Sequence, residues 1–319
     1  MLRSVQISVT GVCLAAAFLL TTAHGFAHGI VGKRLFIEPL VTEDANPKNE
    51  FDFPVLNVIQ GPEGHHVDFN YSFEKKLMPK FSIGFEHSFG RFTPNGPGLP
   101  PVSGFGNVGL AAKYAFYQNP EHEFIMSGSF GIEMPTGNTS IGADPFTTLE
   151  PQFLYAKGFG DLPSGGGLRW LRPFAVQGDL ALAFPAGGPP GHPERRFTPR
   201  ADVVLEYSIP YLNQFVRHAN HHYSLGEGFY RKGHSLGAIV GNLFPFSEFN
   251  FSAAPTGPVS RRALGYVRPG VVYVGHYFEV GGAAEFPANS FTGRSVGGMA
   301  IFDLFIDNVI PALGRMFPN

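Results

Sequence analysis

The first pattern in the chain that could support chemistry is a glycine-rich stretch around one serine. Gly233-His234-Ser235-Leu236-Gly237 matches Gly-x-Ser-x-Gly, the pattern that exposes a nucleophilic serine in many hydrolases. That turn needs a buried strand before the serine and a helix after it. Residues 227–232 do not resemble a buried strand, and residues 238–251 contain Pro245 and are predicted to form a strand. We therefore interpret the match as a chance one in a loop, and keep a barrel enzyme acting on lipid as a remote alternative.

A histidine cluster is the second candidate. His218, His221 and His222 lie in one connector, and His218 and His222 would share a face if that segment were helical. This spacing suits a metal ion, but the glutamate of the metalloprotease arrangement is missing. A solvated loop is the interpretation we prefer, and a loose metal site is the weaker alternative. No cofactor is predicted.

Six charged residues form the third candidate set. Each stands on the polar side of a stretch in which apolar residues alternate with small or polar ones: Glu86, Lys113, Glu133, Asp179, Glu206 and Glu285. A charge that faces lipid near the bilayer midplane costs about 2–4 kcal/mol for Lys or Arg and less for an acid. We therefore expect these side chains to line the lumen of a barrel. Two roles stay open: a mildly acidic pore lining that sets selectivity, or charges that pair with one another, for example Glu86 with Lys113, and plug a closed barrel.

The elements that would position these residues are long strands with a period of two. Within residues 105–118, for example, Leu110, Tyr114 and Phe116 alternate with small residues and Lys113. The second face of such stretches is poor in charge and rich in Gly, Ala and Ser, which is typical of transmembrane barrels rather than of soluble sandwiches. The stretches are also longer than the ~5–6 residues of ordinary strands and reach the ~9–11 residues that cross a bilayer at a tilt.

The alternation predicts an all-β fold, a transmembrane antiparallel up-and-down β-barrel of about 12 strands, an even number that returns both ends to the periplasm. The predicted strands are 51–60, 67–77, 80–92, 105–118, 123–134, 146–160, 170–184, 199–211, 236–253, 263–275, 276–287 and 294–306. Tight turns alternate with long loops rich in Gly and Pro, as in other barrels. Two connectors, 161–168 and 213–235, are long although they fall on the predicted periplasmic side.

The composition agrees with a membrane barrel. Charged residues make up 15% of the chain, against roughly 25% in soluble domains, and there are 33 Phe and 41 Gly. The net charge of −2 gives no basic face for nucleic acid, so no nucleic-acid partner is expected. The expected partners are outer-membrane lipid and lipopolysaccharide, the barrel assembly machinery and a small solute. Arg195-Arg196 and Arg261-Arg262, in predicted external loops, are candidates for contact with lipopolysaccharide phosphates, with ordinary solvation as the alternative.

The N-terminus has the pattern of a secretory signal peptide. Arg3 precedes an apolar run, Val9 to Leu20, that is too short to span a bilayer as a helix. We assign residues 1–25 to the signal peptide, with cleavage after Gly25 or Gly29. Residues 26–50 then form a periplasmic lead-in, 51–306 the outer-membrane barrel and 307–319 a C-terminal tail. The only cysteine, Cys13, lies within the signal peptide, so the mature chain has no disulfide or thiolate site.

Three stretches carry a family resemblance. Gly104 to Tyr114 resembles a loop-to-strand motif of outer-membrane proteins labelled as transporters or as putative phenol-degradation MetA-pathway proteins. Pro135-Thr136-Gly137-Asn138 resembles the Pro-Thr-Gly-Asp that follows the next strand in that family, and the hairpin from Gly270 to Pro287 is the third stretch. The resemblance is best over residues 105–160 and implies a barrel with a transport role. We do not carry phenol over as a substrate, and the lead-in and residues 217–235 match nothing in the family.

Together these patterns predict a barrel of the bacterial outer membrane that acts as a passive channel or transporter for small or apolar solutes, and not as an enzyme. A closed structural barrel without conductance is the alternative. A wide, water-filled lumen would favour the channel, whereas a lumen packed with the lead-in would favour the structural barrel.

Overall fold

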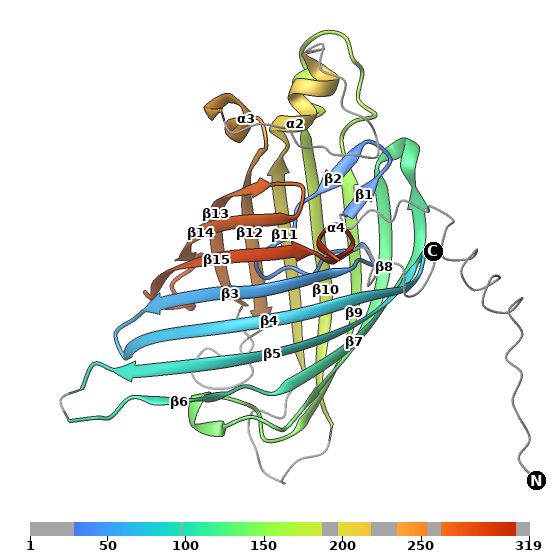
Figure 1. Cartoon of the computed structure of the whole chain (residues 1–319). Coiled ribbons are helices and arrows are strands. Elements are labelled where there is room, and N and C mark those ends of the chain that lie inside the picture. Colours follow the sequence, from blue (N-terminus) through green and yellow to red (C-terminus); the bar gives the residue numbers. More distant parts are fainter. Residues whose placement is uncertain (1–28, 97, 187–196, 218–234, 254–262, 311–319) are drawn as a thin grey trace, which may run out of the picture.

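The computed structural model describes residues 29–96, 98–186, 197–217, 235–253 and 263–310. These residues form a closed antiparallel β-barrel (Figure 1). The predicted signal peptide, the three clustered histidines and both arginine pairs lie outside the described residues.

The barrel wall has twelve strands, as the alternation predicted. β6 and β7 both pair with β5 and together make one broken wall strand, and β15 pairs with β3 to close the ring. Each strand pairs antiparallel with its neighbours. The wall consists of β3 (Glu50–Gln60), β4 (Gly64–Met78), β5 (Phe81–Pro94), β6 (Val102–Phe105), β7 (Val108–Asn119), β8 (Phe124–Met134), β9 (Thr147–Gly158), β10 (Phe174–Ala186), β11 (Thr198–Tyr207), β12 (Leu243–Ala253), β13 (Ala263–Val274), β14 (Phe278–Pro287) and β15 (Val296–Phe305).

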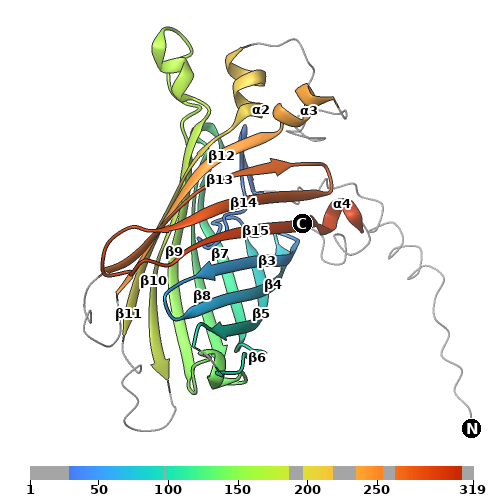
Figure 2. The same ribbon diagram turned by 90° about the vertical axis from the view of Figure 1, so that its left-hand side faces the viewer.

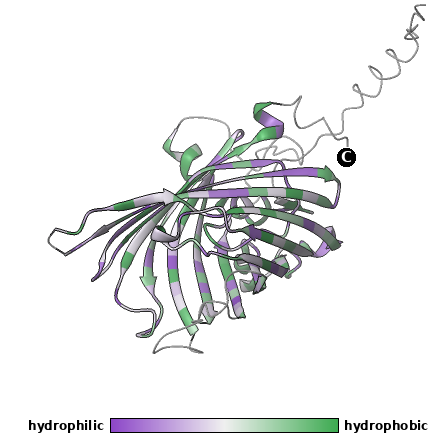
Figure 3. Ribbon diagram, turned by 90° about the horizontal axis from the view of Figure 1, so that it is seen from below, coloured by the Kyte–Doolittle hydropathy of each residue, from purple (hydrophilic) through white to green (hydrophobic). Residues whose placement is uncertain are grey.

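The period-two pattern sorts the wall side chains into an outer and an inner face. On β7, Leu110, Tyr114 and Phe116 are exposed on the outside, whereas Lys113 between them is buried inside. Figure 3 shows apolar and polar residues alternating along the strands. Such an apolar outer face matches the lipid-facing band of membrane barrels. No helix among the described residues is long and apolar enough to cross a membrane.

The strands are not inclined equally. β8–β11 run steeply in Figures 1 and 2, whereas β13–β15 and β3–β5 cross the same views at a shallow angle. The chain enters β3 and leaves β15 at the same end, where the amide of Ile306 donates to the carbonyl of Asn49 at 3.1 Å. An even strand number requires this arrangement, and it identifies that end as the periplasmic one.

Short helical segments lie in the connectors and after the last strand. They are η1 (Pro120–His122), η2 (Thr139–Ile141), η3 (Gly167–Leu171), α2 (Ile209–Tyr211), η4 (Leu212–Val216), α3 (Leu236–Val240) and α4 (Ile306–Val309). Three of them correct predicted strand ends.

The strand predicted at 199–211 ends at Tyr207, because the Ser208 side chain caps α2 and Pro210 fits its first turn. Residues 236–240, predicted as strand, form α3, which the Ser235 side chain caps. The strand predicted from 170 begins at Phe174, after η3. In the first two cases a side-chain cap overrides the alternating pattern, whereas η3 begins without a side-chain cap.

The lead-in lies inside the barrel. We call residues 29–49 the plug: β1 (Gly29–Val31) and β2 (Arg34–Phe36) form a hairpin, and the chain from residue 37 to 49 continues through the lumen (Figure 1). Ile37 is fully buried. We assigned this segment to a periplasmic lead-in, and a lumen packed with it is the arrangement that we expected of a structural barrel.

Apolar packing holds the plug against one part of the wall. The largest buried cluster joins plug and wall residues: Leu35, Ile37, Leu40, Val204, Phe244, Phe246, Val272, Val274, Met299, Ile301 and Phe305. A second cluster joins three further plug residues to β7–β10: Val31, Phe36, Ala45, Ala115, Ile125, Leu154, Ala156 and Ala175. Burial of this apolar surface favours the inserted position at about 25 cal/mol per Å².

Candidate functional site

The candidate site is the lumen between the plug and the inner face of the wall. An extended segment such as 37–43 has backbone N–H groups that no neighbouring strand satisfies. Carboxylates of the wall accept these hydrogen bonds: Ile37 N to Glu206 at 3.2 Å, Glu38 N to Glu279 at 3.0 Å, Leu40 N and Val41 N to Glu248 at 3.2 and 3.0 Å, and Glu43 N to Asp179 at 3.0 Å. The acidic lumen therefore provides acceptors for the plug backbone.

Lys113 joins the plug to two wall strands. Its Nζ lies 2.6 Å from Glu43 of the plug and 2.9 Å from Glu74 of β4, and it donates to the Asn46 carbonyl at 3.4 Å. The side chain is almost fully buried. An ammonium in this position needs its carboxylate partners, because a buried unpaired charge is strongly unfavourable.

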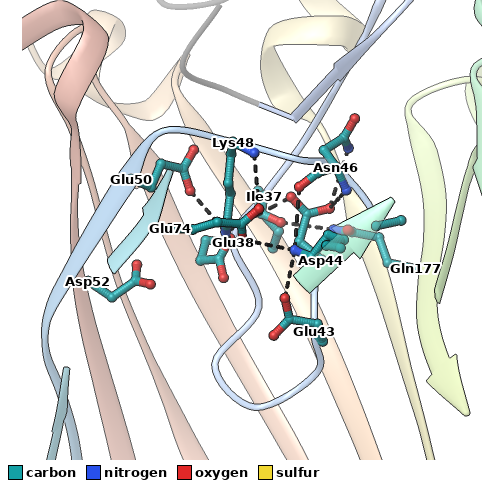
Figure 4. Close-up of polar contacts among 12 residues, drawn as sticks. Ile37, Glu38, Glu43, Asp44, Asn46, Lys48, Glu50, Asp52, Glu74 and Gln177 are labelled. Carbon is teal, nitrogen blue, oxygen red and sulfur yellow. Dashed lines mark hydrogen bonds and ion pairs between the residues drawn. The ribbon is translucent and has the colours of Figure 1, made fainter. Parts of the chain in front are cut away.

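Lys48 is a buried lysine of the plug itself, as Lys113 is a buried lysine of the wall (Figure 4). It pairs with Glu38, with Glu50 at 2.9 Å and with Asp44 at 4.0 Å. Burial alone would lower the pKa of Lys48, but Glu50 and Asp52 reverse this effect and the pKa is raised. Burial raises the pKa of Asp44 to about 7, although Lys113 and the Asn46 amide oppose the rise.

An arginine fixes the periplasmic end of the plug. Arg34 is fully buried, lies 3.3 Å from Glu123 and donates to the Pro173 carbonyl at 2.8 Å. Its guanidinium also stacks on the ring of Tyr211 at 4.1 Å, and the Tyr211 hydroxyl donates to Glu123 at 2.9 Å. A planar guanidinium with several donors suits such a site better than a lysine would.

Two cavities adjoin the plug. A cavity of about 330 Å³ lies between the plug and β3–β5 and extends to Asn107 and Glu133. A smaller one of about 70 Å³ shares Glu43 with it and continues to Lys113. Because β5 runs outwards from the periplasmic turn at 79–80, we call the larger space the outer vestibule and the smaller one the inner cavity.

The six predicted lumen residues fall into two groups. Glu86 and Glu133 line the outer vestibule. Lys113, Asp179, Glu206 and Glu285 are buried against the plug or against other wall residues. The suggested pairing of Glu86 with Lys113 is wrong, because the register places Ser82 opposite Lys113 and Gly109 opposite Glu86.

The wall also carries lumen residues that the sequence did not single out. Glu74, Glu248 and Glu279 accept hydrogen bonds from backbone amides of the plug. Asp303 is fully buried, and neither of its carboxylate oxygens has a hydrogen-bond partner among the described residues. Each of these acids stands within a predicted strand. Its position on the polar side of that strand is the signal that could have identified it.

The serine candidate is tested only in part. Ser235 is exposed and its hydroxyl oxygen accepts a hydrogen bond from the Ala238 amide at 3.2 Å, so it acts as a helix cap. The residues after it form the helix that the hydrolase pattern requires, rather than the expected strand, whereas the residues before it lie outside the described part of the chain. The three histidines of the metal candidate also lie outside it. No group of three or more metal-binding side chains occurs among the residues that the structure describes.

The fold resembles solved outer-membrane barrels. An outer membrane channel from Pseudomonas putida F1 is 10% identical, with a TM-score of 0.55 over 84% of this chain and 99% of that one. The NanC porin is 9% identical over 80% and 98% of the two chains, with a TM-score of 0.46. Outer membrane phospholipase A from Escherichia coli is 8% identical over 84% and 93%, with a TM-score of 0.37.

No protein family and no curated protein matches the sequence, so the resemblance to the MetA-pathway proteins is not confirmed. At 10% identity the likeness to the Pseudomonas channel establishes the fold alone. The chain therefore has the fold of a twelve-stranded outer-membrane β-barrel.

Proposed function

We propose that the chain is a passive outer-membrane channel for small solutes, which pass between the plug and β3–β5. The observation that carries this proposal is the pair of cavities on that side, which share lining residues and are separated from the periplasmic end by Lys113 and its carboxylate partners. In the described state the passage is closed, and movement of the plug opens it.

A closed structural barrel is the second candidate, because the plug occupies the lumen. Two features favour the channel instead. The polar contacts of the plug are the Lys48 ion pair with Glu50 of β3, the Lys48 amide bond to Glu74 of β4 and the Glu43 ion pair with Lys113 of β7, whereas the buried wall residues of its apolar clusters lie on β7–β15. The space beside it is polar and lined by Glu43, Glu86 and Glu133. Polar contacts exchange with water at little net free energy, so this side of the plug can detach while the other stays packed.

The proposal includes no catalytic step. Its partners are the outer-membrane lipid around the apolar outer face, lipopolysaccharide at the outer rim, the barrel assembly machinery and the solute. The likeness of the fold to that of a channel supports this proposal.

Single-channel recording of the refolded mature protein in a planar bilayer tests the proposal. We expect conductance steps whose open fraction increases in Lys113→Gln, which removes the ion pairs to Glu43 and Glu74. Glu121→Gln, an exposed change in the periplasmic η1 turn, is the matched control.

A reversible lock tests which side of the plug moves. The Thr42 hydroxyl accepts from Asn250 of β12 at 3.3 Å, so cysteines at these two positions bring a plug thiol next to a thiol on the side that stays packed. The oxidised double variant is expected to conduct like the reduced one, with Thr42→Cys alone as the control, whereas silence after oxidation alone would show that the whole plug has to leave the lumen. Well-folded, heat-modifiable protein that is silent in every form contradicts the channel and leaves the structural barrel.

A further inference from the structure

The outer vestibule has an excess of negative charge. Five carboxylates line it, and no lysine or arginine does. They are Glu38, Glu43, Asp52, Glu86 and Glu133.

Two of these acids are already paired. Glu38 is neutralised by Lys48, and Glu43 by Lys113. Glu133 has only the neutral amide of Asn107, at 2.8 Å. For Glu86, no hydrogen bond or ion pair is found within the described part of the chain. The vestibule therefore contains carboxylates with no cationic partner.

Asp52 adds a nearly buried carboxylate to the lining of the outer vestibule. Its side chain lines the vestibule and is 7% exposed. One oxygen accepts from the Ser72 hydroxyl at 2.5 Å, and the other has no hydrogen-bond donor within the described ranges of the chain. A buried carboxylate oxygen without a donor is unfavourable by about 1–3 kcal/mol or more, unless a ligand supplies one.

We propose that the outer vestibule binds a small aliphatic amine in its protonated form, held between Asp52, Glu86 and Glu133. This inference rests on the proposed channel only for the consequence of binding and not for the binding itself. An ammonium group has three N–H donors and a positive charge, which match the unpaired acceptors. Neutral acceptors on the same lining, Asn70, Ser72 and Ser88, provide positions for the remaining N–H groups.

The size of the vestibule and the spacing of its acids favour an organic cation over a metal ion. At roughly 30 Å³ for each water-sized group, a volume of about 330 Å³ holds a molecule of about ten non-hydrogen atoms. No three acidic or histidine side chains converge closely enough to hold a metal ion within the described residues. The acids instead border a space that an alkyl chain with one or two ammonium ends can occupy.

The position of Glu43 links binding to the passage. Glu43 lines both cavities and holds Lys113 at 2.6 Å. A second ammonium in the vestibule competes with Lys113 for this carboxylate. The bound amine thereby weakens the contact that closes the inner cavity.

Equilibrium dialysis of radiolabelled 1,4-diaminobutane against the refolded protein in detergent tests the proposal. We expect saturable binding that falls about tenfold in Glu86→Gln, the change in Kd that corresponds to 1.4 kcal/mol. A similar loss is expected for Glu133→Gln, and none for Glu121→Gln, whose side chain lies in η1 at the opposite end. Glu86 has no partner among the described residues, so its removal leaves the fold intact, which heat modifiability checks.

Competitors define the ligand class. Unlabelled butylamine is expected to displace the probe, whereas 1,4-butanediol, succinate and Mg²⁺ are not. Displacement by butanediol, or binding unaffected by both glutamate variants, overturns the proposal. Because binding is measured without a bilayer, an amine that binds to a silent barrel contradicts only the channel, and a conducting barrel that binds no amine contradicts only this site.

Discussion

The plug contacts two sides of the barrel in different ways. Towards β11–β15 it buries Leu35, Ile37 and Leu40 in an apolar cluster, with wall carboxylates on its backbone amides. Towards β3–β5 it is held by Lys48, which pairs with Glu50 and donates its amide to Glu74, while Lys113 of the neighbouring β7 pairs with Glu43, and cavities remain. Apolar packing is lost over short displacements, whereas charged groups can exchange partners with water or solute. The comparison teaches that the β11–β15 side anchors the plug and the β3–β5 side is where it can yield.

The largest expected loss of plug docking free energy comes from a substitution on the anchored side. Ile37→Ala removes a fully buried side chain from the main cluster and should weaken docking of the plug by about 2–5 kcal/mol. Hydrogen exchange of the plug amides in the refolded barrel measures this free energy. Val41→Ala, at a side chain that is 38% exposed, is the matched control and should change it little. Equal effects of both variants would show that the apolar cluster does not anchor the plug.

A smaller loss is expected from the hydrogen bonds of the same side. Glu248 accepts from the amides of Leu40, Val41 and Thr42 and from the Thr42 hydroxyl. Glu248→Gln replaces one acceptor oxygen with a donor, so docking should weaken by about 1–3 kcal/mol. Limited proteolysis of the refolded barrel measures the change, because a plug that docks more weakly is cleaved at a lower protease concentration. If Glu248→Gln exceeds Ile37→Ala, polar contacts dominate both sides and the contrast between them fails.

The charged side should respond to pH through Asp44. Its pKa in the docked plug is about 7, raised by burial from the ordinary 3.8, although Lys113 and the Asn46 amide oppose the rise and Glu74 and Glu43 add to it. The docked plug therefore binds a proton that a released plug gives up. The contribution of Asp44 to docking is fully present below pH 3.8 and is lost as the pH rises through about 7.

The open fraction of the channel should therefore increase from about pH 5 to about pH 8. Asp44→Asn cannot ionise and should remove most of this dependence, which recordings at matched ionic strength would detect. A pH response that survives unchanged in Asp44→Asn would assign it to another group.

The smallest effect is expected in ion selectivity. Glu133 lines the outer vestibule and binds only a neutral amide, so Glu133→Gln should lower the preference for cations without changing the open fraction. Reversal potentials in a salt gradient measure this preference. Glu206→Gln, whose carboxylate accepts from the Ile37 amide on the anchored side, should instead change the open fraction. The reverse result would place the passage on the wrong side of the plug.

The sequence by itself determined the wall. Its alternation gave twelve strands, most of their bounds and the side of each strand that faces outwards, because strand periodicity is local and lipid excludes charge from one face. It missed the ends near Ser208 and Ser235, where a side-chain cap starts a helix.

Only the tertiary structure decided what fills the lumen. The contacts that hold the plug join residues far apart in the chain, as Glu38 and Glu279 show, and they exist only once β15 has paired with β3. Whether Lys113 meets Glu86 or Glu43 depends on strand register and on the inserted plug, and neither is encoded in the alternation of a single strand. The same closure places Asp52 and Glu86 on the lining of the outer vestibule, beside the inserted plug.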